Sequence, residues 1–254
     1  MLLTIDIGNT NINIGIFDGD KLCMSSRIAT ERQKTDDQFA VDFTNILNMN
    51  KIDAVNISGG IISSVVPEIT SAVKNASERV TGKKIIVLSP GVKTGLNIKI
   101  DNPAQLGADI AAGAVGVSSA YPLPACVIDL GTATKIYAVD ADKSFRGCMI
   151  APGLAISLKA LTDISSLLPA ISLEPPKKAC GTNSIESMQS GIILGTAAMI
   201  DGLLDRFAEE LGEPKSIIAT GGLSGFIAPV CKHNITLDSD LIFKGLKAIY
   251  EKNN

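Results

Sequence analysis

The feature that most constrains this chain is a short acidic turn that occurs twice, nearly half of the chain length apart. The first copy, DIGNTN, occupies residues 6–11, and the second, DLGTAT, occupies residues 129–134. A short apolar run precedes each copy and another segment of strand-like composition follows it. Repetition of a whole strand-turn-strand unit at this spacing predicts two structurally similar halves.

The residue types in these turns suit a phosphate with its metal. Gly8 and Gly131 permit backbone conformations that turn amide N–H groups toward an anion, and Thr132 adds a hydroxyl donor. The carboxylates of Asp6 and Asp129 would repel a bare phosphate unless a cation lay between them. The pattern therefore favours a metal-bound nucleotide. For either copy alone, an ordinary hairpin turn whose Asp and Thr cap their own backbone remains an equal alternative.

Length and composition narrow the class of protein. A chain of 254 residues exceeds the usual size of one core, which predicts two domains, residues 1–117 and 118–254. A net charge of −3 without a Lys/Arg cluster argues against nucleic acid and anionic membrane as the main partner. No apolar run approaches the ~20 residues of a membrane span. Five cysteines without zinc spacing suit a reducing cytoplasm.

Hydrophobic periodicity predicts three strands followed by a helix in each half. A capping box at Thr35 and a proline at residue 67 mark two helix starts in the first half. A strand at 54–58 with a turn at 59–60 is also expected. The remaining expected elements are strands at 2–7, 11–17, 22–28, 85–88, 126–128, 135–139, 145–150 and 217–219, and helices beginning near 103, 153, 184 and 241.

Two βββαβα halves, each opening with an Asp-x-Gly turn, resemble the duplicated ribonuclease H-like α/β fold shared by actin, hexokinase-like sugar kinases and Hsp70 ATPases. That resemblance implies a nucleotide cleft between two actin-like ATPase domains. In detail the chain is similar to the type III pantothenate kinases of bacterial coenzyme A synthesis. The motifs that carry this resemblance are DIGNTNINIGIFDG at 6–19, ISSVVP at 62–67, DNPAQLGAD at 101–109, DLGTAT at 129–134, IAPGL at 150–154, NSIESMQSG at 183–191 and TGG at 220–222.

The resemblance implies ATP-dependent phosphorylation of pantothenate to 4'-phosphopantothenate, the first step of coenzyme A biosynthesis, by a cytoplasmic homodimer. Asp109 would be the base that accepts the hydroxyl proton. Asp6 would hold Mg²⁺, and Asp129 a monovalent cation, K⁺ or NH₄⁺. The implied nucleotide-binding residues are Asp6, Ile7, Gly8, Asn9, Thr10, Asn11, Ile12, Asn13 and Thr132. The implied substrate-binding residues are Gly107, Ala108, Asp109, Ile110 and Ser184.

The chain departs from the family pattern mainly on the side of the phosphate acceptor. The family motif Gly-x-Asp-Arg ends here in Ile110, and Ile100 stands where a tyrosine is usual. Ser184 replaces a threonine and keeps the hydroxyl. Lys135 follows the second turn where the family usually has a small hydroxyl residue. We expect Lys135 to be a surface strand lysine, with contact to the phosphates as the alternative.

These departures leave other functions open. The chain could act on a different, less anionic hydroxylated metabolite, or it could bind nucleotide as a regulatory relative without transferring phosphate. Lys99 could replace the missing arginine. Asp109 could merely stabilise a helix N-terminus through the helix dipole. His233, in a polar loop, is expected to be structural, and Gly191 with Gly195 could permit close helix packing within or between subunits.

Overall fold

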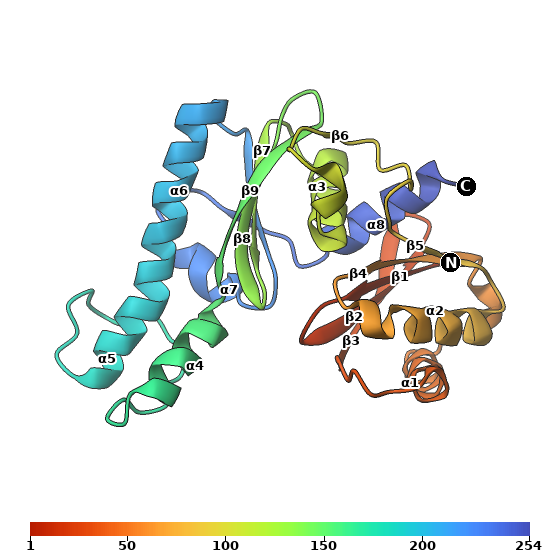
Figure 1. Cartoon of the computed structure of the whole chain (residues 1–254), viewed down its shortest axis with the longest axis horizontal. Helices are drawn as coiled ribbons and strands as arrows, with labels where there is room; N and C mark the ends of the chain where they lie inside the picture. Colours follow the sequence, from red (N-terminus) through yellow and green to blue (C-terminus); the bar gives the residue numbers. More distant parts are fainter. The chain divides into compact units, whose positions relative to one another are not determined.

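The computed structural model describes residues 1–254, and its contacts divide them into two units (Figure 1). The first unit comprises residues 1–95, 102–119 and 242–254, and the second comprises residues 96–101 and 120–241. The expected halves, 1–117 and 118–254, follow this division over most of the chain. They differ from it where the C-terminal helix joins the first unit and where residues 96–101 join the second.

The first unit contains a five-stranded sheet with the order β3-β2-β1-β4-β5. Strand β1 runs antiparallel to β2 and parallel to β4, so it lies at the centre of the sheet. The three strands predicted at the N-terminus are confirmed to within about one residue at each end. The strands are β1 (Leu2–Ile7), β2 (Asn11–Asp18), β3 (Lys21–Ala29), β4 (Gly59–Ser64) and β5 (Ile85–Val87).

The prediction for residues 54–60 is wrong. Residues 54–56 form a short 3₁₀ helix, and the two glycines expected in a turn instead open the buried strand β4. A Cβ atom added at Gly60 would lie 2.9 Å from the carbonyl oxygen of Leu3 and 2.8 Å from Cδ1 of Ile85. Glycine is therefore needed here for close strand packing, and not for a turn.

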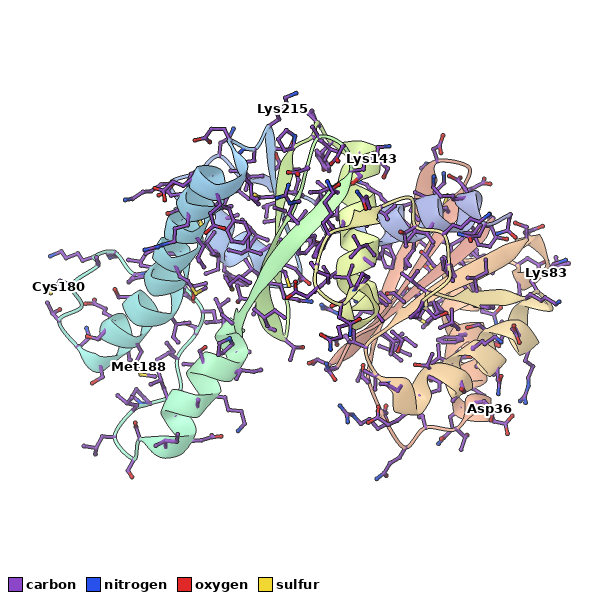
Figure 2. All side chains as sticks on the ribbon, turned by 45° about the horizontal axis from the view of Figure 1, so that its top comes forward. Asp36, Lys83, Lys143, Cys180, Met188 and Lys215 are labelled. Carbon is purple, nitrogen blue, oxygen red and sulfur yellow. The ribbon has the colours of Figure 1, made fainter.

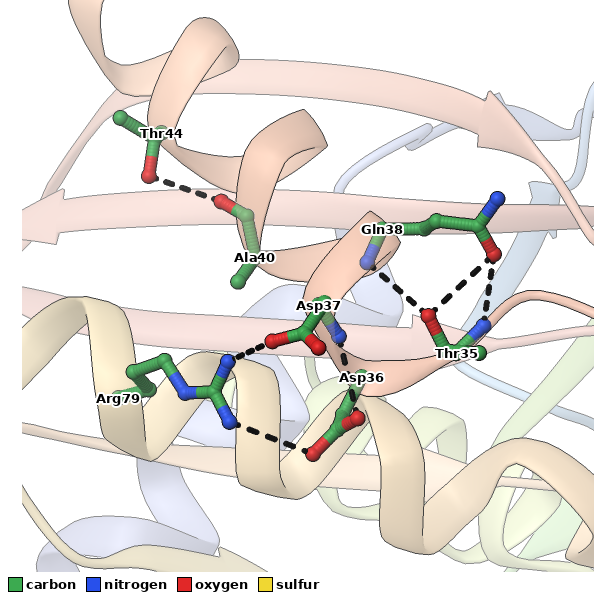
Figure 3. A network of polar contacts seen from close by, with 7 residues as sticks. All are labelled: Thr35, Asp36, Asp37, Gln38, Ala40, Thr44 and Arg79. Atoms are coloured by element: carbon green, nitrogen blue, oxygen red, sulfur yellow. Dashed lines mark hydrogen bonds and ion pairs between the residues drawn. The ribbon is translucent and has the colours of Figure 1, made fainter.

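Two helices cover one face of the first sheet, α1 (Asp36–Met49) and α2 (Pro67–Thr81). Ile5 and Ile7 of β1 share one core with Phe39 of α1 and Ile69 of α2. Both helices begin where the sequence predicts, at the capping box of Thr35 and at Pro67. Figure 3 shows how Arg79, near the end of α2, forms ion pairs with Asp36 and Asp37 at the start of α1.

The opposite face of this sheet packs against the C-terminal helix, α8 (Leu241–Lys252). Leu2 and Phe17 form a small core with Phe243 of that helix. Because successive strand residues point to opposite faces, Asp6 lies on the same face as Leu2. Helix α8 also contacts α3 (Ala108–Ala120), the helix that carries Asp109.

The second unit repeats the strand order of the first. Its sheet has the order β11-β10-β7-β8-β9-β6, so β7 occupies the central place of β1, flanked by an antiparallel β8 and a parallel β10. The expected duplication is thus present in the structure, with β6 as an additional edge strand. The strands are β6 (Asn97–Ile98), β7 (Ala125–Leu130), β8 (Ala133–Val139), β9 (Ser144–Pro152), β10 (Ser216–Thr220) and β11 (Thr236–Leu237).

Helices cover one face of the second sheet, where Ile128 and Ile136 share a core with Ile193 and Ile200 (Figure 1). The helices of this unit are α4 (Leu154–Ile164), α5 (Ser184–Gln189), α6 (Gly195–Leu211) and α7 (Ser224–Ile227). A π-helical turn at residues 190–194 joins α5 to α6, so the helix predicted from 184 to 211 is confirmed. Cys180 lies in the exposed segment that precedes α5 (Figure 2).

The joined helix from Ser184 to Leu211 is, by length and composition alone, long and apolar enough to cross a membrane. Of its most apolar 18 residues, 39% are buried inside the fold, and the core helices of soluble proteins can have the same length and composition. Gly191 and Gly195 lie on this helix, and a Cβ atom added at either would meet nothing closer than 3.9 Å. Close packing against another helix of the same chain is therefore not what these glycines serve.

Two polar contacts fix loops in the second unit. The hydroxyl of Tyr121 donates a hydrogen bond to Asp238 at 2.8 Å. Burial is the larger cause, and this bond a smaller one, that raises the pKa of Tyr121 to about 12. Nε2 of His233 lies 2.9 Å from Oδ1 of Asp205, an exposed carboxylate. These contacts are consistent with the expected structural role of His233.

The close approach between α8 and α3 in the first unit gives a testable prediction. A Cβ atom at Gly245 of α8 would lie 1.8 Å from the carbonyl oxygen of Ala112 on α3. Because backbone atoms cannot yield as a side chain can, we expect Gly245→Ala to lower the free energy of unfolding by at least about 1–3 kcal/mol. Urea denaturation measures this change.

Gly202→Ala in α6 is the matched control, since a Cβ there meets nothing within 4 Å. It should stabilise the protein by roughly 0.5–1 kcal/mol, because alanine is the better helix former. Equal effects of the two substitutions would contradict the close packing of α8 on α3.

Candidate functional site

A row of polar side chains crosses the centre of the first sheet at the carboxyl end of β1. Asp6 pairs with Asn13 on β2 and with Ser63 on β4. Oγ of Ser63 donates to Oδ1 of Asp6 at 2.5 Å, and Nδ2 of Asn13 donates to Oδ2 at 3.4 Å. Asp6 is only 6% exposed, so these hydrogen bonds offset the cost of burying its charge. The row holds one carboxylate in a fixed orientation.

The turn after Asp6 is fixed by its own backbone. The N–H of Gly8 donates to the carbonyl oxygen of Asn11 at 2.9 Å, and the carbonyl of Gly8 accepts from Oγ1 of Thr30 at 2.7 Å. Asn9 and Thr10 are exposed at the tip. The turn therefore places the side chains of Asn9 and Thr10 at an exposed tip, while the Gly8 N–H is bonded within the turn and does not face outward.

Arg32 is a residue beside this turn that sequence reasoning missed. Its Nη2 donates to Oδ1 of Asn9 at 3.2 Å, and its Nη1 pairs with Glu68 at 3.1 Å. Both charged side chains are 56% exposed. No motif marks Arg32, because the contact depends on how the segment after β3 returns to the first turn.

A second row crosses the second sheet at the equivalent position. Asp129 is the second-to-last residue of β7. It lies opposite Lys135 on β8 and Thr220 on β10. Nζ of Lys135 lies 2.6 Å from Oδ2 of Asp129, and the two side chains are 14% and 11% exposed. The prediction that Lys135 is a surface lysine is wrong. It faces the same side of the sheet as Asp129, because residues directly opposite each other on paired strands share a face.

Three sequence motifs of the second unit meet at the turn that contains Thr132. A Cβ atom added at Gly153 would lie 2.3 Å from the carbonyl oxygen of Thr132. At Gly221, where φ is +92°, a Cβ would lie 2.6 Å from the carbonyl oxygen of Leu130. The IAPGL and TGG motifs thus supply glycines that let neighbouring backbone approach the DLGTAT turn. Their glycines are accounted for by packing, and Thr132 remains exposed at the tip.

Asp109 lies in the first turn of α3 and is half-buried. Its Oδ1 accepts a hydrogen bond from the backbone N–H of Ile110 at 2.8 Å. A Cβ atom at Gly107 would lie 2.6 Å from that same oxygen, so the glycine leaves room for the carboxylate. Ile110 itself is 6% exposed and belongs to the interior of the unit. Its burial argues against an apolar pocket wall at this position.

The other two residues considered for the acceptor side, Ser184 and Lys99, belong to the second unit, whereas Asp109 belongs to the first. Ser184 is exposed as the first residue of α5, whose N-cap is Asn183. Lys99, considered as a substitute for the missing arginine, instead pairs with Asp142 at 3.2 Å. Asp6 and Asp109 belong to the first unit, whereas Asp129, Thr132 and Ser184 belong to the second.

The two aspartate rows differ in how well they fit a cation. Ser63 and Asn13 are neutral donors, which orient the carboxylate of Asp6 without cancelling its charge. Such a carboxylate suits Mg²⁺, which is commonly held by one or two carboxylates, water and substrate phosphates. At Asp129 the ammonium of Lys135 already contacts the carboxylate. That arrangement does not fit an additional monovalent cation.

Two other features of the molecule offer no competing chemistry. Burial raises the pKa of the Cys126 thiol to about 11, so it stays protonated and is not a thiolate nucleophile. A groove of about 400 Å³ borders the end of α1. It is lined by Thr44, Leu47, Asn48, Lys51, Ile52, Asp53, Ala54 and Val80. None of the predicted site residues lines that groove.

Comparison with known sequences decides the family. The sequence model of the family described as type III pantothenate kinase matches residues 2–206. A protein named type III pantothenate kinase from Halalkalibacterium halodurans is 41% identical over 254 residues, which is 100% of both chains. One of the same name from Moorella thermoacetica is 37% identical over 253 residues, again 100% of both chains. This chain belongs to the type III pantothenate kinase family.

Solved structures support the fold. A Baf family protein from Campylobacter jejuni has a TM-score of 0.64 at 22% identity and covers 99% of this chain and 98% of its own. Component A of the (R)-2-hydroxyglutaryl-CoA dehydratase of Acidaminococcus fermentans has a TM-score of 0.58 at 15% identity, with 98% and 96% covered. These likenesses confirm the mixed α/β fold with two sheets that the motifs predict.

Proposed function

We propose that this chain is an ATP-dependent kinase that transfers the γ-phosphoryl group to the hydroxyl of pantothenate, giving 4'-phosphopantothenate for coenzyme A synthesis. Family membership over the full chain carries this proposal, together with the retained Asp6 and Asp109. Phosphoryl transfer needs positioning and charge neutralisation more than covalent catalysis. The buried, oriented carboxylate of Asp6 and the half-buried carboxylate of Asp109 suit those two needs.

In this proposal each residue has a defined task. The turn from Gly8 to Asn13 and the hydroxyl of Thr132 receive the ATP phosphates, and Asp6 holds Mg²⁺, which neutralises phosphate charge when bound. Asp109 accepts the proton of the acceptor hydroxyl as its oxygen attacks the phosphorus. Gly107 and Ala108 place that carboxylate, and Ser184 offers a hydroxyl to the acceptor.

The acceptor side of the proposed site lacks a charged group that the family motif contains. Ile110 replaces the arginine of the family motif, and its side chain is buried. Losing a hydrogen bond to a charged group typically costs ~1.5–3 kcal/mol, roughly ten- to a hundredfold in affinity. We therefore expect a high KM for pantothenate. The same replacement favours, as a second candidate, a less anionic hydroxylated metabolite as the acceptor.

A coupled ADP-release assay with pantothenate, ATP and Mg²⁺ tests the main proposal. Asp109→Asn should lower kcat by about 10²–10⁴-fold, the range that a general base contributes, while ATP binding is retained. Asp37→Asn is the matched control because Asp37 also lies in the first turn of a helix, α1. It should leave turnover unchanged, which excludes a mere helix-dipole effect.

Three results would decide between the candidate functions. Turnover with pantothenate that Asp109→Asn abolishes supports the pantothenate kinase. Turnover only with another hydroxylated metabolite supports the second candidate. ATP binding without turnover on any acceptor contradicts both and favours a regulatory nucleotide-binding relative.

We further propose that the protein is a homodimer that uses an apolar surface of the second unit. Large apolar side chains are exposed on β9, α4, α5 and the segment after α4. They are Ile150, Ile156, Leu161, Ile164, Leu167 and Ile185, exposed by 41% to 92%. Soluble monomers rarely expose large apolar patches, so this number of exposed apolar side chains on one unit favours an interface. The exposed glycines at 191 and 195 suit close approach of a partner.

Sedimentation velocity tests the dimer. The wild-type protein should sediment as a dimer, and Ile164→Glu should shift it toward the monomer because a buried unpaired carboxylate opposes association. Val41→Glu is the matched control, since Val41 is an exposed apolar residue, 60% exposed, on α1 of the first unit. A monomeric wild type, or equal dissociation by both variants, would contradict the proposed surface.

A cytoplasmic location is also part of the proposal. None of the five cysteines forms a disulfide, although Cys23, Cys148 and Cys180 are exposed. Exposed free thiols suit a reducing compartment, because oxidising compartments favour disulfides. This observation agrees with the expectation from cysteine spacing.

A further inference from the structure

The ion pair between Lys135 and Asp129 has no role in the proposed function as described above. Nζ of Lys135 lies 2.6 Å from Oδ2 of Asp129, a distance typical of a charge-assisted hydrogen bond. Both side chains are mostly shielded from solvent, at 14% and 11% exposure. Solvent screening is therefore reduced, and the positive charge stays beside the carboxylate.

The duplicated fold shows that the lysine is not needed to build the row. In the first unit the equivalent strand position holds Asn13, and Asp6 is satisfied by the neutral donors of Asn13 and Ser63. In the second unit Thr220 occupies the position of Ser63. The two rows thus differ in the residues on the paired strands: the carboxylate of Asp6 accepts hydrogen bonds from the neutral side chains of Ser63 and Asn13, and that of Asp129 pairs with the ammonium of Lys135.

A purely stabilising role explains this difference poorly. Replacing a buried ion pair by well-packed neutral residues is often neutral or stabilising, so such pairs are weak evidence for a stability function. The first row is an internal example of a neutral solution. The added charge at Lys135 therefore points to a requirement for positive charge at this turn.

We infer that the ammonium of Lys135 supplies, beside Asp129, the positive charge that a bound K⁺ or NH₄⁺ would otherwise supply, so that phosphate transfer by this chain needs no monovalent cation. The inference rests on the proposed kinase function. An alkylammonium carries the charge and the N–H donors of NH₄⁺, and its three N–H groups can serve a carboxylate and a phosphate together. Because it is covalently attached, no binding equilibrium is needed to place it.

The first test measures the cation dependence of ADP release in buffers free of potassium and ammonium, with tetramethylammonium chloride holding the ionic strength. Addition of K⁺ should change the wild-type rate by less than about twofold, the scale of residual screening effects. Lys135→Thr should lower the rate by at least about tenfold without K⁺, because a charge-assisted contact is lost. Saturating K⁺ or NH₄⁺ should restore much of that loss.

Lys74→Thr is the control for removing a lysine from an ion pair. Lys74 pairs with Glu78 on the surface of α2, where its side chain is 40% exposed. This variant should keep the wild-type rate and its independence of K⁺. A K⁺ requirement in both lysine variants would point to a general salt effect and would contradict the inference.

The second test needs no acceptor and no turnover. Thermal melts with K⁺ replacing tetramethylammonium should leave the Tm of the wild type unchanged, because there is no site to fill. Lys135→Thr should melt at a lower temperature and regain Tm specifically with K⁺, since a cation that binds the native state stabilises it. If that variant fails to fold, the wild-type titration alone still decides the question.

The outcomes separate this inference from the proposed function. Kinase activity that strictly requires K⁺ in the wild type overturns the inference and leaves the kinase intact. Loss of activity in Lys135→Thr that neither K⁺ nor NH₄⁺ restores, with Tm also unresponsive, overturns it as well. Absence of any kinase activity contradicts the proposed function, whereas the melts still test the exchange of lysine for cation.

Discussion

The architecture depends on burying a carboxylate at the carboxyl end of a central strand. Asp6 and Asp129 are 6% and 8% exposed, and each is placed where one antiparallel and one parallel neighbour can reach it. Burial of an ionised group is costly unless hydrogen bonds or a counter-charge compensate. The first unit compensates with a hydroxyl and an amide, and the second with an ammonium. Each solution leaves a different electrostatic surface at the turn that follows.

Helix packing connects the sheet that contains Asp6 with the helix that carries Asp109. Helix α8 covers the sheet face on which Asp6 lies and meets α3 where Gly245 approaches Ala112. The last residues of the chain thereby support the helix that begins with the proposed base. A terminal segment that contains none of the motifs thus packs against the helix that carries Asp109, and residues 242–254 belong to the first unit.

The sequence was sufficient for the fold class and for most elements because period-two and helical patterns are local signals. The helix starts at Thr35 and Pro67 were predictable from capping chemistry alone. Residues 54–60 were not, because paired glycines usually signal a turn and only the contact with Leu3 shows why they lie in a strand. The burial of Lys135 is not predictable from its own segment for a similar reason. Its burial follows from cross-strand pairing with Asp129, which no pattern within the segment reveals.

Equilibrium binding of ATP, measured by calorimetry with and without Mg²⁺, tests the central claim that the Asp6 row holds the metal of the nucleotide. Wild-type protein should bind ATP more tightly when Mg²⁺ is present. Asp6→Asn, which keeps the shape of the side chain and removes its charge, should lose that dependence on Mg²⁺. An Asp6→Asn protein whose ATP affinity rises with Mg²⁺ as much as that of the wild type would contradict the account.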